Sequence, residues 1–133
     1  MDNRKDIKDA ADIELLVNDF YDSVRNDSVL SPIFLKRIPN AAAWPQHLRI
    51  MCNFWETVLF GNGNYRGNPF PKHLGLGIET IHFDRWINLF HKTVDHHFIG
   101  EKAEEAKDRA EKMRTLFEIK LNQSGENSFR HLV

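Results

Sequence analysis

Apolar side chains recur every three or four residues in four long stretches of this chain, which glycine, proline and short polar runs separate. This spacing places the apolar residues on one face of an α-helix and the polar residues on the other. A shorter helix is predicted after Ser31-Pro32, because serine caps helices and proline fits the first helical position. The predicted helices span residues 9–26, 33–37, 44–60, 81–98 and 101–122, with Thr80 as the cap of the fourth. No alternating strand pattern occurs in the sequence, which therefore predicts an all-α fold.

The helices are predicted to form a single domain, because 133 residues is an ordinary size for one hydrophobic core. Residues 10–122 are expected to form the helical core of this domain. Residues 1–8 are rich in charge and residues 123–133 begin with a polar run, so both ends are predicted to be flexible tails.

Between Gly61 and Gly77 the helical pattern gives way to a glycine-rich stretch that also contains Pro69 and Pro71. A loop of this length is uncommon in a compact domain unless it has a function. His73 follows the two prolines and has apolar neighbours, so its backbone is stiff and its surroundings are not those of a solvated loop. The stretch is therefore predicted to present His73 to a large apolar ligand.

Composition narrows the class of protein further. With 41% hydrophobic and 28% charged residues the chain should fold in water, and its net charge of -1 and pI near 6.6 argue against nucleic acid as a partner. Cys52 is the one cysteine, so no intramolecular disulfide can form. No apolar run is long enough to cross a membrane, and the charged amino terminus does not resemble a signal peptide. A cytoplasmic protein is expected.

The chain is rich in large rings, with ten phenylalanines, three tryptophans and two tyrosines. Such rings fill wide cores or line pockets for flat ligands. One such ligand is haem, whose iron takes a neutral imidazole on one face and needs a sheltered pocket with a few donors on the other. His73 in the loop and His47 on the apolar stripe of a helix could lie on opposite faces of a haem. Tyr21 and Trp86, on the stripes of two other helices, would add an O–H and an N–H donor.

These residues also occur in motifs that resemble a known family, the truncated haemoglobins of group III. The motifs are Phe20-Tyr21, His47 with Asn53-Phe54-Trp55, Lys72-His73-Leu74 and Arg85-Trp86-Ile87-Asn88-Leu89-Phe90. They occur in the family's order and spacing, and the similarity covers residues 10–121. The chain has no glycine before Gly61, whereas groups I and II typically carry glycine pairs near helix boundaries.

The resemblance implies a two-over-two helical globin sandwich that binds haem b, iron protoporphyrin IX. It makes His73 the proximal iron ligand, and it places Tyr21, Trp86 and His47 on the distal side, where the gas binds. The other cofactor-binding residues that it implies are Phe20, Met51, Phe54, Trp55 and Leu76. Met51 departs from the β-branched residue expected at its position, and its flexible thioether is expected to change ligand kinetics. The sequence leaves open whether His47 binds the iron or gates the pocket.

The function that the resemblance implies is binding of dioxygen, nitric oxide and carbon monoxide. Donors from both Tyr21 and Trp86 would slow the release of dioxygen, since a hydrogen bond to a partly charged acceptor is worth about 1.5 to 3 kcal/mol. We therefore predict tight oxygen binding, with nitric oxide detoxification or peroxide chemistry as candidate reactions. A nitric oxide dioxygenase-like or peroxidase-like activity would need a separate reductase, because the chain has no flavin or nicotinamide motif.

Two other interpretations of the sequence are open. His91, Asp95 and either His96 or His97 lie near one another on one predicted helix and could bind zinc in a helical metal-binding module. Alternatively, the rings are simply core, and the chain is a helical protein-interaction module. A haem protein would show a strong Soret band, and the other two would not.

Overall fold

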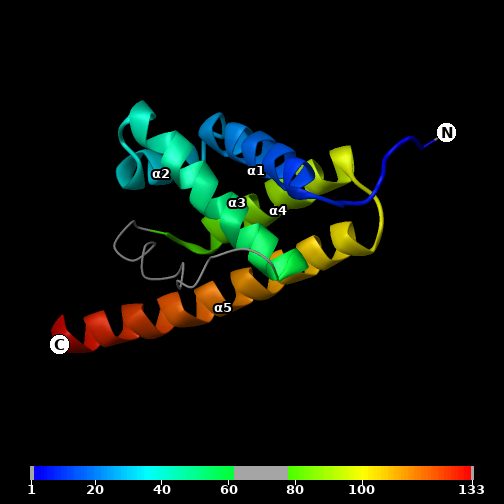
Figure 1. The fold of residues 1–133 in the computed structure, drawn as a ribbon. Coiled ribbons are helices and arrows are strands. Elements are labelled where there is room, and N and C mark those ends of the chain that lie inside the picture. The colour runs from blue at the N-terminus through cyan, green and yellow to red at the C-terminus, as the bar shows by residue number, and fades with distance from the viewer. Residues whose placement is uncertain (1, 62–77, 133) are drawn as a thin grey trace.

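The computed structural model describes residues 2–61 and 78–132, with residues 121–132 described by their backbone alone. The described residues form five α-helices and one short 3-10 helix, in the order that Figure 1 shows. They are α1 (Ala10–Arg25), α2 (Ser31–Arg37), η1 (Ala41–Ala43), α3 (Trp44–Phe60), α4 (Thr80–His97) and α5 (Glu101–Leu132). The predicted all-α fold is confirmed. In this described part of the chain, no helix combines the length and the apolar character that crossing a membrane requires.

Local side-chain chemistry sets the ends of α1 and α3 where the sequence predicted them. The side chain of Asp9, just before α1, accepts a hydrogen bond of 3.0 Å from the backbone N–H of Asp12. Pro45 lies in the first turn of α3, where the missing N–H would have had no partner within the helix. α3 ends at Phe60 and is followed by Gly61, whose φ of +71° is in the left-handed region that glycine adopts without a steric penalty.

The start of α2 differs from the prediction. Ser31 is the first residue of α2 rather than its cap, and Leu30 precedes it without a side-chain hydrogen bond. The free N–H groups of the turn before the helix are satisfied by Asp27, whose Oδ2 accepts from Val29 and Leu30, both at 3.0 Å. A buried carboxylate thus provides the hydrogen-bond acceptor that was predicted for Ser31.

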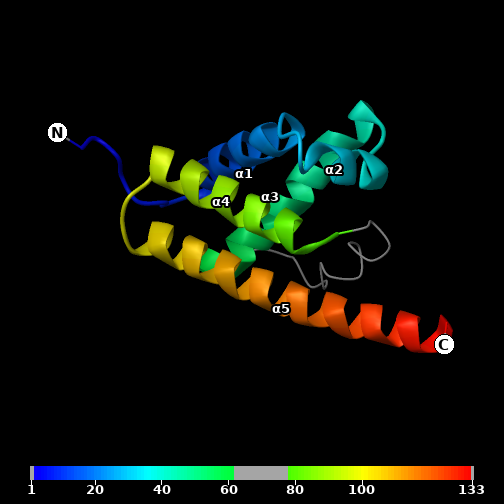
Figure 2. The same cartoon turned by 180° about the vertical axis from the view of Figure 1, so that it is seen from behind.

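Two pairs of helices pack on each other (Figure 1 and, from behind, Figure 2). α1 packs on α3 and α4 packs on α5, while α1 also contacts α4 and α3 contacts α5. This is the predicted two-over-two arrangement. Large rings fill the centre where the pairs meet: Phe20 and Phe90 are 2% and 1% exposed, and Trp55 stacks on Phe90 with 4.9 Å between ring centroids.

The segment before α1, expected to be a flexible tail, is instead anchored to the connection between α4 and α5. Ile7 is 2% exposed, and the backbone oxygen of Lys5 accepts a hydrogen bond of 3.1 Å from Ile99. The carboxylate of Asp6 accepts from the first turn of α5, with 2.9 Å to the N–H of Lys102 and 2.8 Å to that of Ala103. Asp6 therefore caps a helix that begins almost a hundred residues later.

The carboxyl-terminal end also differs from the prediction. α5 continues to Leu132, beyond Asn122, where the sequence predicted that the helix would end. The polar residues and the glycine after Asn122 lower helix propensity, but no proline interrupts the backbone hydrogen bonds. Both views show this end of α5 extending past the other helices.

Candidate functional site

A cavity of about 330 Å³ lies among the five helices, and all of them contribute to its wall. Its lining is mainly apolar and aromatic, which is typical of a site for a flat organic ligand. The described residues that line it are Tyr21, Leu30, Ile33, Phe34, Arg37, Ile38, Pro39, Ala43, Gln46, His47, Ile50, Met51, Ile78, His82, Phe83, Trp86, Met113 and Phe117. None of these described residues is an aspartate or a glutamate.

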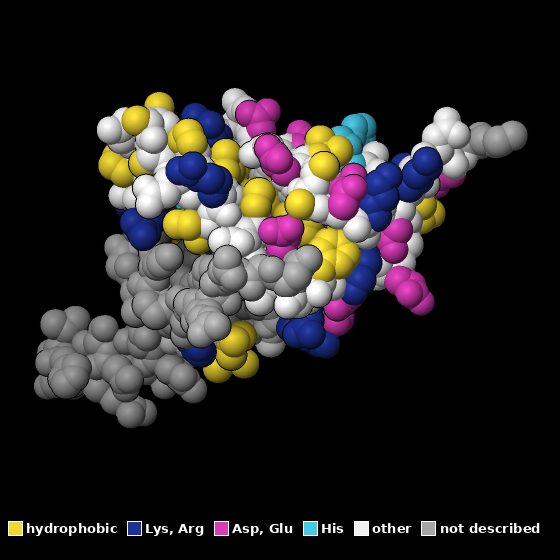
Figure 3. Space-filling view, in the orientation of Figure 1, with side chains coloured by type: hydrophobic (Ala, Val, Ile, Leu, Met, Phe, Trp, Pro, Cys, Tyr) yellow, Lys and Arg dark blue, Asp and Glu magenta, His cyan; other side chains and the backbone are white. Residues whose placement is uncertain are grey.

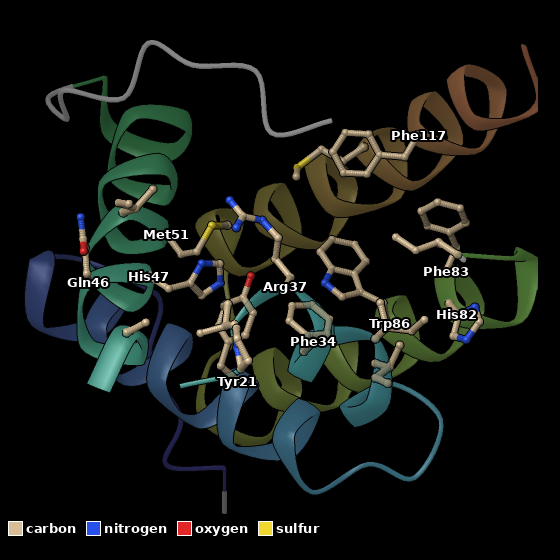
Figure 4. A pocket seen from close by; sticks show the side chains of 18 residues that line it. Tyr21, Phe34, Arg37, Gln46, His47, Met51, His82, Phe83, Trp86 and Phe117 are labelled. Carbon is tan, nitrogen blue, oxygen red and sulfur yellow. The ribbon is translucent and has the colours of Figure 1, made fainter. Parts of the chain in front are cut away.

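The three side chains predicted to face a bound gas come together in this lining. Tyr21 projects from α1, His47 from α3 and Trp86 from α4 toward the same space (Figure 4). The Tyr21 and His47 rings meet edge to face, with 5.0 Å between centroids and an interplanar angle of 86°. Tyr21 is 4% exposed, so its hydroxyl is held in a setting where hydrogen bonds are stronger than in water.

The ring of Phe20 lies outside the cavity lining and restrains the side chains of Tyr21 and Trp86. Its centroid lies 4.9 Å from that of Tyr21 and 5.8 Å from that of Trp86, and both contacts are edge to face. Trp86 also stacks on Phe90 at 5.9 Å with an angle of 14°. Because rings on both sides restrict them, the Tyr21 and Trp86 donors have few orientations open to them.

The predicted cofactor-binding residues of α3 divide into two groups. Met51 lines the cavity, whereas Phe54 and Trp55 do not; they are buried behind the lining at 8% and 2% exposure. Their rings pack edge to face on each other at 5.2 Å, and Trp55 also stacks on Phe90. Both rings are therefore in contact with core residues. Phe54, Trp55 and Phe20 thus support the cavity wall rather than form it.

The predicted proximal ligand is not among these residues. His73 and Leu76, with the rest of the stretch from 62 to 77, lie outside the described residues. The assignment of His73 to the haem iron therefore stays a prediction.

Several lining residues were not predicted. Phe34 and Arg37 come from α2, and Phe34 packs edge to face on Tyr21 at 5.9 Å. At another part of the wall, Phe83 of α4 and Phe117 of α5 form a small cluster of their own. Both lie on apolar stripes that the helical period indicated, but nothing in the pattern distinguished a cavity wall from ordinary core.

His82 lines the cavity, and its hydrogen bond with Glu79 shows that the predicted cap of α4, Thr80, is wrong. The backbone N–H of Glu79 donates to Nδ1 of His82 at 2.9 Å, so Glu79 precedes α4 and the predicted cap, Thr80, is its first residue. Since Nδ1 accepts this bond, the neutral ring carries its proton on Nε2. His82 is thereby held at the start of α4 and contributes a second imidazole to the cavity wall.

The zinc hypothesis finds no support in the described part of the chain. In residues 2–61 and 78–120 no three histidine, cysteine or acidic side chains are grouped as a metal site requires. The candidate ligands contact other groups: Asp95 pairs with Lys107 at 2.8 Å, and His97 Nε2 lies 2.5 Å from the carboxylate of Asp19. His91 lies 3.5 Å from Glu111.

The molecular surface shows no single dominant charge. On the face that Figure 3 displays, basic and acidic side chains are mixed and apolar side chains lie between them. The acidic and basic residues of the whole chain nearly balance, with 18 Lys and Arg against 19 Asp and Glu. Interspersed charges of this kind are ordinary for a solvated domain surface.

Helices paired two over two around an aromatic cavity, with three polar side chains gathered in its wall, define a globin-type domain. The family described as bacterial-like globin matches residues 6–121. The chain therefore belongs to the bacterial-like globin family.

Similarity to individual proteins agrees with this family and refines it. The group 3 truncated hemoglobin ctb of Campylobacter jejuni subsp. jejuni is 32% identical over 115 residues, which is 85% of this chain and 91% of that protein. The crystal structure of a group III truncated hemoglobin from Campylobacter jejuni matches with a TM-score of 0.82 and 30% identity, over 89% of this chain and 94% of that one. The resemblance to group III and the two-over-two globin fold are confirmed.

Membership of the globin family implies that the protein binds haem and, through it, diatomic gases. The described residues fit that group. The lining offers apolar and aromatic surface for a porphyrin and carries no described carboxylate that would repel the acidic groups of haem. The side chains of Tyr21, His47 and Trp86 face the same space within this lining.

Proposed function

We propose that the chain binds haem b through His73 and retains dioxygen tightly beside Tyr21, His47 and Trp86. The observation that carries this proposal is that these three polar side chains, from three different helices, line one largely apolar cavity. Haem supplies the binding of diatomic gases and the electron transfer. The chain supplies the donors, their orientation and the exclusion of bulk water.

Tyr21 and Trp86 are assigned as hydrogen-bond donors to bound dioxygen. The gas carries partial negative charge in haem proteins, so a phenolic O–H and an indole N–H both stabilise it. At about 1.5 kcal/mol, the lower value for a charge-assisted bond, one donor slows dissociation by about tenfold. Two donors favour retention and reaction of the gas over its transport.

His47 is assigned to the wall on the α3 side, as a gate and not as an iron ligand. Its ring is half-buried and held edge to face between Tyr21 at 5.0 Å and Trp44 at 5.6 Å, and these contacts restrain it. Replacing His47 by leucine should leave the absorption spectrum of the ligand-free ferrous protein unchanged while altering the rate of ligand entry. A change in that spectrum would show that His47 binds the iron.

The reaction that this site favours is oxidation of nitric oxide. Nitric oxide and dioxygen combine to nitrate with the uptake of one electron, and a separate reductase in the cytoplasm would supply that electron. The slow release of oxygen would keep one substrate in place until the second arrives. Peroxide reduction is a second candidate, because His47 places an imidazole in the wall that could transfer protons to and from a peroxide.

Replacement of Tyr21 by phenylalanine tests the proposal directly. The oxygen dissociation rate, measured by stopped flow, should rise by about tenfold, because the ring is retained and only its O–H is lost. Thr93→Val is a matched control: it also removes a buried hydroxyl, one that donates to the carbonyl of Leu89 at 2.8 Å and lies outside the cavity lining. Equal rates in wild type and Tyr21→Phe would remove Tyr21 from its role as a donor.

A further inference from the structure

One basic side chain lies at the cavity. Arg37, the last residue of α2, is the only lysine or arginine among the described lining residues. Figure 4 shows its side chain directed into the space between Met51 and Trp86. The residue as a whole is exposed, so the guanidinium lies where the cavity meets solvent.

Several basic residues of the described chain are held by acidic side chains. Arg85 pairs with Asp27, Arg114 with Asp84 and Lys107 with Asp95. Arg37, by contrast, makes no hydrogen bond or ion pair among the described residues. A guanidinium without an internal partner that is directed into a cavity is suited to bind an anionic ligand there.

We propose that Arg37 binds a propionate carboxylate of the haem. The inference rests on the proposed haem binding and specifies how this chain holds the charged edge of the cofactor. Haem carries two carboxylates on one edge of an apolar plate, so its apolar part must enter the cavity while the carboxylates stay near water or a cation. Arg37 is a cation whose planar donors match a carboxylate. Its exposed position leaves the resulting ion pair partly solvated.

Phe34 gives the arginine a defined place. It lies on the same helix, three residues earlier, and its ring packs on Tyr21 at 5.9 Å and on Trp44 at 6.3 Å. α2 is therefore docked by apolar contacts, and its last residue has limited freedom. A small anionic ligand such as azide, bound inside the cavity, is the alternative partner that could compete with the propionate for this guanidinium.

The test compares two cofactors in four proteins: wild type, Arg37→Ala, Arg37→Lys and the control Lys36→Ala. Lys36 is the adjacent residue of α2, also exposed and basic, and it is outside the described lining. The measurement is the rate of haem loss to excess apomyoglobin, for haem b and for its dimethyl ester, which lacks the two charges. Azide affinity of the ferric protein is measured in parallel.

For haem b, Arg37→Ala should lose the cofactor about five- to tenfold faster than wild type, the effect expected of one partly solvated charge-assisted hydrogen bond. Arg37→Lys should fall between the two, and Lys36→Ala should match wild type. With the dimethyl ester, Arg37→Ala and wild type should lose the cofactor at the same rate. These rates of haem loss, together with an azide affinity that is the same in all four proteins, would support the proposal.

Three outcomes would overturn it. Equal acceleration for both cofactors would assign Arg37 to packing rather than charge, and no acceleration would show that it does not reach the propionate. Loss of azide affinity without faster haem loss would identify the anion as an exogenous ligand. A wild-type protein that takes up neither cofactor would instead refute the haem binding on which the inference rests.

Discussion

The guanidinium Nε of Arg85 donates a hydrogen bond of 2.7 Å to Oδ1 of Asp27, and this ion pair joins α4 to the turn before α2. Asp27 is 7% exposed, and its second carboxylate oxygen accepts two backbone N–H groups of the same turn. Arg85 precedes Trp86, and the turn leads into the helix that carries Phe34 and Arg37. The pair therefore fixes two walls of the cavity relative to each other.

The first prediction concerns the strength of this pair. Asp27→Ala should lower the free energy of unfolding by about 2 kcal/mol, because buried N–H groups lose their acceptor. Arg85→Ala should cost less, since Asp27 keeps its backbone partners. Urea titration of the haem-loaded proteins should give a coupling energy of about 1 kcal/mol in a double-mutant cycle.

The exposed pair of Asp84 and Arg114 is the matched control for this cycle. Its side chains are 55% and 27% exposed, so its coupling should stay below about 0.5 kcal/mol. A coupling for Asp27 and Arg85 no larger than that of the control pair would contradict the structural role given to them.

The same carboxylate predicts a pH dependence. Burial acts to raise the pKa of Asp27, but hydrogen bonds from Arg85 and from the backbone of Leu30 and Val29 outweigh burial and hold the pKa below its ordinary value of 3.8. A group whose folded-state pKa is lowered stabilises the fold above its unfolded pKa and loses this contribution as the pH falls through the folded pKa. The stability difference between wild type and Asp27→Asn should thus be constant near neutral pH and shrink below pH 3.8.

Urea titrations at a series of pH values measure this difference. A difference that does not change as the pH is lowered below the ordinary pKa of the carboxyl would show that the charge of Asp27 contributes nothing. The Asn variant is preferable to Ala here, because it retains the shape of the side chain.

Gly100 gives a third prediction. Its φ is +142°, and a Cβ added there would lie 2.5 Å from Cγ of Asp6, the side chain that caps α5. Gly100→Ala should therefore combine backbone strain with displacement of the cap and cost about 2 to 4 kcal/mol of stability. Gly61→Ala is the control: its φ is +71°, but a Cβ would meet nothing within 4 Å, so only about 1 kcal/mol of strain is expected. The free energy of unfolding of both variants is measured by urea titration. Equal losses of stability in Gly100→Ala and Gly61→Ala would mean that Asp6 does not hold the amino-terminal segment.

Cys52 gives a fourth prediction. Burial raises the pKa of its thiol to about 11, from an ordinary 9.0, and the negative charges of Glu14 and Glu56 add to the shift. At pH 8 the thiolate population should be about a hundredfold below that of an ordinary cysteine, because each pKa unit is a factor of ten. Reaction with a disulfide reagent should be slow in the folded protein and reach the rate of a free thiol in urea. A fast reaction of the folded protein would show that partial burial neither shields this thiol nor raises its pKa.

The parts of the site that the sequence predicted lie on long helices. His47 and Met51 are four residues apart on α3, and the helical period alone places both on one face, which proves to be the cavity side. Trp86 and Phe90 have the same spacing on α4, and their rings stack at 5.9 Å. A repeated pattern over several turns carries enough information to orient a side chain.

The parts that were missed depend on short segments or distant contacts. α2 has seven residues, too few for a period to show that Phe34 and Arg37 face the cavity. Ile7 is a single apolar residue among charges, and Asp6 becomes a cap only because the start of α5 folds back beside it. Local sequence carries no signal for such contacts.

The last prediction concerns the second proposed donor. Trp86→Phe keeps an aromatic ring on Phe20 and Phe90 but removes the indole N–H from the cavity wall. If Trp86 donates to bound dioxygen, the dissociation rate should rise by about tenfold, as for Tyr21→Phe. If both donors contact the same gas molecule, the double variant should release oxygen faster than either single variant, though by less than the product of the two effects because the pair is coupled.

Trp44→Phe is the control for this series. Trp44 is buried at 4% exposure and contacts both Tyr21 and His47, yet it does not line the cavity, so loss of its N–H should leave oxygen release unchanged. A faster rate in Trp44→Phe would mean that disturbing the packing around Tyr21 is enough to release the gas. A rise confined to Trp86→Phe would assign the effect to its indole N–H, because the two substitutions delete the same group and differ in whether that group reaches the cavity.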